Sequence, residues 1–157
     1  MKTLQIDETQ AKELYNKAIP ELKQMLEEIF GDDFFNVIEK VKTFAEALEV
    51  TGRPEVPKFF DVPEDLRKFF EATYKVVVIN EALNDGIRFK LYDLNVNRYY
   101  PWFATNGSSS GFAFRGSHYD DAIAFTGGGS RFCLKDEETA KYAGTQFKNE
   151  YREMLES

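Results

Sequence analysis

The stretch that decides the fold is Val76-Val77-Val78-Ile79, four β-branched residues in a row. Such residues are enriched in strands, so taken alone this stretch favours β structure. No turn residue separates it from the apolar residues that recur at helical spacing on both sides, namely Leu66, Phe69, Phe70, Tyr74, Ala82 and Leu83. The pattern therefore predicts one helix that is apolar all round and lies buried at the centre of the protein.

The chain carries signals for both ends of this helix. Asp61 and Glu64 have the spacing of a capping pair, and Pro63 falls in the first turn, where its missing N–H costs little. Gly86 predicts the C-cap. The preceding residues 53–61 hold two prolines and predict a loop.

Other helices are predicted upstream. Asp7 and Gln10 predict a capping box, and Pro20 breaks or kinks the chain after the first helix. The next apolar stripe, which ends at Gly31, comprises Leu22, Met25, Leu26 and Ile29. A third stripe, predicted as one helix up to Gly52, comprises Val37, Ile38, Val41, Phe44, Ala45 and Leu48.

The period changes after Gly86. Strands are predicted at residues 87–92, 98–103, 112–115, 122–125 and 131–134, with a turn-rich loop over 106–111. Pro101 confines its strand to an edge or a bulge. Asp136 caps a predicted final helix whose inner face comprises Ala140, Ala143, Phe147, Tyr151, Met154 and Leu155.

These elements predict an α+β fold with an N-terminal helical layer, a small antiparallel sheet and a C-terminal helix packed on it. The 157 residues suit a single domain, 1–157. Within it, residues 1–86 are mainly helical, 87–135 are strands and loops, and 136–156 form the closing helix.

Composition excludes several classes of protein. The net charge of −7 argues against binding duplex nucleic acid, and no apolar run approaches the length of a membrane helix. One Cys and one His exclude the common zinc sites, so neither a metal nor a cofactor is predicted. The N-terminus has no secretory signal, so we expect a soluble intracellular, cytoplasmic protein.

The predicted working surface lies in the aromatic second half. Rings of this density could stack on a base or a sugar, and the backbone N–H groups of residues 127–129 could form an anion nest beside an arginine. The alternative is that the rings pack inside and the glycines form a hairpin loop. The candidate ligand-binding residues are Arg98, Tyr99, Tyr100, Trp102, Arg115, His118, Ser130 and Arg131.

Hydrolytic chemistry has one candidate segment. The only His of the chain, His118, precedes Asp120 and Asp121, and this combination could serve acid–base catalysis. The simpler interpretation is a turn-forming loop in which His118 is solvated, and Cys133 is best explained as a small buried hydrophobe.

Three segments together resemble a known group of proteins. They are Ile79–Gly86, Arg98–Phe103 (RYYPWF), and Ser130–Lys135 continuing to Lys141–Phe147. Their order resembles small uncharacterised proteins from phages and prophages of Bacteroidetes, over about residues 74–151. Ile87 stands where that group has Trp, and Phe132 and Leu134 exchange the Leu and Phe around the cysteine. The resemblance implies a phage origin and supplies no catalytic residues.

The sequence thus predicts a non-enzymatic phage or prophage protein. Its predicted partner is a phage or host protein, or a small anionic or nucleotide-like molecule. Two alternatives stay open: a hydrolase that uses His118, Asp120 and Asp121, and a self-assembling component that forms a homo-oligomer through an apolar interface.

Overall fold

The structure is a computed structural model that describes residues 6–89, 96–120 and 131–157. The chain divides into two compact units, residues 1–40 and residues 41–157. The prediction of a single domain stays a prediction. The α+β class is confirmed, with a two-stranded antiparallel sheet and a C-terminal helix packed on it.

The first unit contains helices α1 (Glu8–Lys17), α2 (Pro20–Phe30), α3 (Asp32–Phe35) and α4 (Val37–Lys40). The capping box is confirmed, because the Gln10 N–H donates to the Asp7 carboxylate at 2.8 Å and the Asp7 N–H donates to the Gln10 side chain. Pro20 occupies the first position of α2, and Gly31, with φ of +89°, ends it. The core of this unit comprises Ala11, Leu26 and Phe35.

The third predicted stripe is not one helix. It divides into α4 and α5 (Phe44–Thr51), because Thr43 starts a new helix. The Thr43 hydroxyl accepts the Glu46 N–H, and the Glu46 carboxylate accepts the Thr43 N–H at 2.8 Å. This T-x-x-E capping box is visible in the sequence and outweighs the continuous apolar spacing.

The ambiguous stretch is helical, as predicted. It lies inside α6 (Glu64–Leu83), where Val76, Val78 and Ile79 are buried and Val77 is half-buried. Both ends differ from the prediction by a few residues. Pro63 rather than Asp61 is the N-cap, and Asn84 is the C-cap, two residues before Gly86.

The sheet is a hairpin of β1 (Arg98–Ala104) and β2 (Ala113–Asp120). Pro101 pairs with Ser117 in this two-stranded sheet, and the register shifts after Trp102, so both parts of the prediction for Pro101 are met. The shift makes Arg115 the extra residue of a β-bulge. On its other edge β1 forms a single bridge from Tyr99 to Leu134.

Several strand predictions are wrong. Residues 87–89 are irregular, and residues 131–134 contribute only the bridge at Leu134. The predicted loop around His118 is instead the second half of β2, because it pairs with β1 along its length. Residues 90–92 and 122–125 lie outside the described residues.

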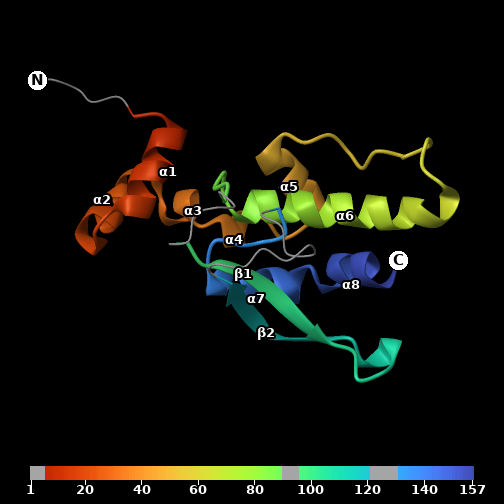
Figure 1. Cartoon of the computed structure of the whole chain (residues 1–157). Helices are drawn as coiled ribbons and strands as arrows, with labels where there is room; N and C mark the ends of the chain where they lie inside the picture. Colours follow the sequence, from red (N-terminus) through yellow and green to blue (C-terminus); the bar gives the residue numbers. More distant parts are fainter. Residues whose placement is uncertain (1–5, 90–95, 121–130) are drawn as a thin grey trace, which may run out of the picture. The chain divides into compact units, whose positions relative to one another are not determined.

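The predicted final helix is two helices, α7 (Glu137–Gln146) and α8 (Lys148–Glu156). Asp136 caps α7 as predicted, accepting the Thr139 N–H at 2.7 Å. Phe147, with φ of −105° and ψ of 27°, separates the two helices and is itself buried. The bend lets α7 cover the hairpin while α8 packs along α6 (Figure 1). The sequence has no proline at this division, and Gly144, three residues before Phe147, lies inside α7.

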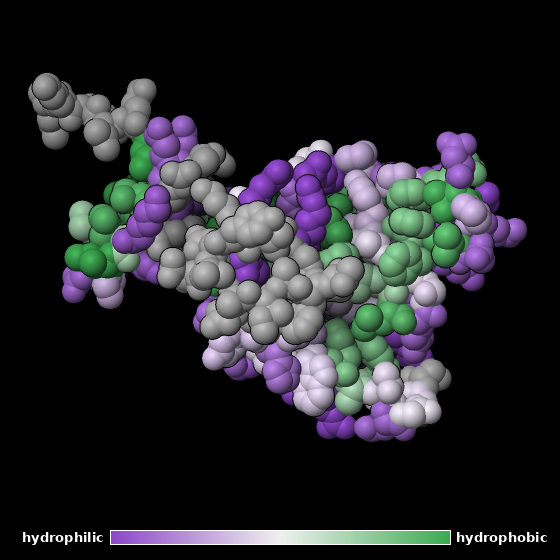
Figure 2. Space-filling model, viewed as in Figure 1, coloured by the Kyte–Doolittle hydropathy of each residue, from purple (hydrophilic) through white to green (hydrophobic). Residues whose placement is uncertain are grey.

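An apolar surface lies on the first turns of α6. None of the residues 64–71 is buried, whereas most of the following residues are. Figure 2 shows apolar side chains gathered over the end of α6 where the helix begins. We call this surface the α6 patch; its exposed members are Phe60, Leu66, Phe69 and Phe70.

Candidate functional site

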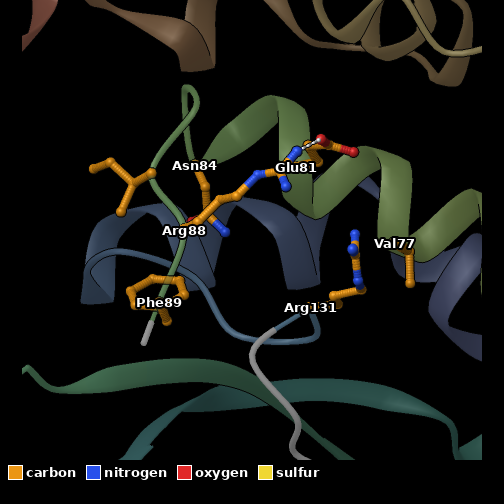
Figure 3. Close-up of a pocket in the computed structure, with 7 residues that line it drawn as sticks. Val77, Glu81, Asn84, Arg88, Phe89 and Arg131 are labelled. Carbon is orange, nitrogen blue, oxygen red and sulfur yellow. Dashed lines mark hydrogen bonds and ion pairs between the residues drawn. The ribbon is translucent and has the colours of Figure 1, made fainter. Parts of the chain in front are cut away.

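A pocket lies against the last two turns of α6. Its cavity has a volume of about 130 Å³. Helix α6 contributes one wall, because Val77, Glu81 and Asn84 lie four and three residues apart and so share a face. The other lining residues are Ile87, Arg88, Phe89 and Arg131 (Figure 3).

Glu81 is the carboxylate of this pocket, and arginines surround it. Arg53 binds it with both arms of its guanidinium, Nε donating to Oε2 at 2.9 Å and Nη2 to Oε1 at 2.7 Å. Arg88 lies 3.4 Å from the same Oε1. The hydrogen bonds from Arg53 lower the pKa of Glu81, and the charges of Arg88 and Arg131 add to the effect. Glu81 is therefore ionised and already satisfied at neutral pH.

Arg131 approaches the pocket from a different part of the chain. Figure 3 shows its side chain entering from the segment before α7, while Arg88 reaches across from the segment after α6. No ion pair holds Arg131 among the residues that the structure describes. Among the described residues, three guanidinium groups thus face the Glu81 carboxylate, in a chain whose net charge is −7.

The backbone beside Arg131 is fixed by Asn84. The Asn84 amide donates to the Cys133 carbonyl at 2.8 Å, and its side-chain oxygen accepts the Lys135 N–H at 2.9 Å. The next residue, Leu134, exchanges two backbone hydrogen bonds with Tyr99 of β1. Helix, pocket wall and sheet are therefore joined at one place. Cys133 is buried beside this junction, as predicted.

The predicted aromatic residues gather on the hairpin. His118 lies opposite Tyr100, and the Trp102 ring meets the His118 ring edge-on at 5.2 Å between centroids. Trp102 is 50% exposed, so it does not complete the core. Tyr99 contacts Tyr119 with its ring centroid 5.6 Å away.

The structure divides the predicted site. Arg98 is buried at the start of β1, Arg115 is exposed at the bulge, and neither lines the pocket. Arg131 does line it, whereas the aromatic residues of the hairpin do not. Ser130 and the glycines at 127–129 lie outside the described residues.

The alternative catalytic residues are placed only in part. His118 lies in a strand beside two rings rather than in a solvated loop, although its side chain is exposed. Asp120 ends β2 opposite Arg98, and Asp121 lies outside the described residues. Across the described ranges, no three His, Cys, Asp or Glu residues gather as metal ligands would. None of the helices described there is long and apolar enough to cross a membrane.

Sequence reasoning missed most of the pocket. Val77 and Glu81 belong to a helix that the sequence predicts to be apolar all round. The pattern predicts a strand at Arg88 and a loop at Arg53, the partner of Glu81. A signal was present, since Glu81 and Asn84 place two polar side chains on one face near the end of a buried helix. A buried helix keeps such residues where they find partners.

Comparisons with protein-family models, curated proteins and solved structures found no match. The three segments of the phage resemblance nevertheless meet in space. Asn84 binds the 133–135 segment, Tyr99 pairs with Leu134, and Gly144 packs against Pro101.

Proposed function

We propose that this chain is a non-enzymatic binding protein that holds a small anionic molecule in the pocket at the end of α6. The observation that carries the proposal is the excess of arginine over carboxylate around Glu81. The resemblance to phage and prophage proteins supports a phage origin, with a place in the host cytoplasm or on a virion. That part of the proposal rests on sequence motifs alone.

The repulsion of an anion by the C-terminal end of α6 is weaker than the attraction of the two arginines in the lining. The C-terminal end of α6 carries a partial negative charge that disfavours an anion by about 0.3–1 kcal/mol. A hydrogen bond to a charged group contributes about 1.5–3 kcal/mol, and Arg88 and Arg131 each offer several donors. Arg53 neutralises Glu81, so the carboxylate repels a second anion only weakly.

Isothermal titration calorimetry with inorganic phosphate, benzoate and adenosine monophosphate tests the proposal. We expect at least one of these probes to bind with a stoichiometry of one. Arg131→Ala should weaken that binding by about tenfold or more, the loss of one charge-assisted contact. Arg115→Ala is the matched control, because Arg115 is an exposed arginine that does not line the pocket.

Two outcomes would contradict the proposal. One is that none of the three probes binds at millimolar concentration. The other is that Arg115→Ala and Arg131→Ala weaken binding equally, which would indicate attraction to general surface charge. Circular dichroism of each variant checks that the fold is retained.

A second candidate function is self-association through the α6 patch. Phe60 is 72% exposed, and Phe69 and Phe70 lie edge to face with ring centroids 5.5 Å apart. Exposed apolar surface of this kind marks contact sites in many proteins. Sedimentation equilibrium should then show a dimer that Phe70→Glu dissociates, and a monomer at all concentrations would dismiss this candidate.

A further inference from the structure

The pocket defines more of its ligand than a negative charge. We propose that its ligand is the dianionic phosphate group of a small phosphomonoester, with the organic part in contact with the apolar lining residues Val77, Ile87 and Phe89. This inference deepens the proposed function and rests on it. It follows from the number and origin of the arginines, the size of the cavity and the apolar residues of its lining.

Arg88 and Arg131, the two arginines of the pocket lining, come from different segments of the chain. Arg88 follows α6, whereas Arg131 precedes α7. Each guanidinium presents a planar fork that matches two oxygens. A carboxylate has only two oxygens and satisfies one fork. A phosphomonoester has three terminal oxygens and can accept hydrogen bonds from both arginines together. Its double charge also suits the two positive charges that Arg88 and Arg131 bring to the lining.

The size of the cavity limits the ligand. At about 130 Å³ it is well below the roughly 300 Å³ at which pockets begin to enclose drug-sized molecules. A phosphate group with a few carbon atoms fits this volume, whereas a complete nucleotide would extend beyond it. The apolar residues of the lining, Val77, Ile87 and Phe89, would contact those carbon atoms.

Phenyl phosphate and benzoate form a matched pair of probes. They share the aromatic ring and differ in the charged group, a phosphate against a carboxylate. We expect phenyl phosphate to bind at least about tenfold more tightly than benzoate at pH 7.5, because benzoate forgoes the contacts of one arginine. Arg88→Ala and Arg131→Ala should each remove most of that difference. Adenosine monophosphate tests the source of the phosphate, and we expect it to bind no more tightly than phenyl phosphate.

The pH dependence gives a second, independent readout. The second pKa of a phosphomonoester is about 6, so about a tenth of it is dianionic at pH 5 and nearly all at pH 7.5. If the dianion is the bound form, the apparent dissociation constant should fall about tenfold over that range. Glu81 keeps its charge over that range because its pKa is lowered, and arginine side chains do not titrate there. Benzoate affinity should change little.

The failures of the two proposals differ. Benzoate binding as tightly as phenyl phosphate, with loss of both on Arg131→Ala, would overturn the phosphate assignment and keep an anion site. A phenyl phosphate affinity that does not change between pH 5 and 7.5 would also overturn it. Binding of neither probe would overturn the phosphomonoester assignment, and both proposals would be overturned if inorganic phosphate and adenosine monophosphate also failed to bind. Arg131→Lys tests whether the planar guanidinium matters beyond its charge. Because lysine keeps the charge but lacks the fork, it should restore less than half of the affinity that Arg131→Ala loses, measured on a logarithmic scale.

Discussion

Replacing Gly144 with alanine separates two effects on stability, helix propensity and side-chain packing, which act in opposite directions. Gly144 lies within α7 and is buried against the hairpin. A methyl group there would lie 2.4 Å from Cδ2 of Phe114 and 2.8 Å from Cβ of Pro101. Helix propensity alone predicts that Gly144→Ala stabilises the protein, whereas this close contact predicts that it destabilises it.

The magnitudes decide the sign. Alanine in place of glycine inside a helix gains about 0.5–1 kcal/mol. Inserting one carbon into a closely packed contact costs about 1–3 kcal/mol. Pro101 cannot move away from the added methyl group, because its strand is paired with β2. We therefore expect a net loss of about 1–2 kcal/mol. For a chain of this length that lowers the melting temperature by roughly 2–8 °C.

Thermal and urea unfolding monitored by circular dichroism measure this change. Gly116→Ala is the matched control, because a methyl group on that strand glycine would meet nothing within 4 Å. Combining Gly144→Ala with Phe114→Leu should recover part of the loss, since the smaller side chain vacates the contact. A Gly144→Ala protein that melts at a higher temperature than the parent would refute the packing of α7 on the hairpin.

Three further substitutions probe the core and the hairpin face. Val76→Asp should prevent folding, because a lone buried charge costs about 3–5 kcal/mol, whereas Val77→Asp should stay folded, as judged by far-UV circular dichroism. Tyr151→Phe should cost about 1–3 kcal/mol in urea unfolding, since the buried Asn80 oxygen loses its 2.6 Å hydrogen bond; the double variant with Asn80→Leu should cost less than the two single changes summed. Trp102→Ala should cost about 1 kcal/mol or less by the same measurement, far from the 3–5 kcal/mol of a core aromatic, and a larger loss would mean that the ring is structural.

The helical part of the fold could be predicted because its signals are local. The Asp7 capping box, the break at Pro20 and the end at Gly31 depend on residues within a turn of each other, and all three hold. The helix through Val76–Ile79 was also predictable, since a long apolar period outweighs the β preference of four residues. The split at Thr43 was equally local, and its T-x-x-E signal could have been used.

The elements that were predicted wrongly depend on distant partners. Residues 116–120 look like a loop in sequence because Gly, Ser and Asp favour turns, yet they pair with β1 across the hairpin. The segment at 131–134 has strand-like residues but finds only one partner, Tyr99. The division at Phe147 arises because α7 must lie on the hairpin while Tyr151 reaches Asn80 of α6. No pattern within ten residues carries that information.

The candidate site shows the same limit at the level of single side chains. Arg131 was predicted as a ligand-binding cation, and the structure places it in a pocket, but beside Arg88 and Glu81 rather than beside the aromatic residues. Two hydrogen bonds join Asn84 to the backbone of the 133–135 segment just after Arg131, about fifty positions further along the chain. An arginine cluster is costly to assemble because like charges repel, so Glu81 and its bond to Arg53 have a physical role there. The negative charge of Glu81 reduces the repulsion between Arg88 and Arg131 in this small space.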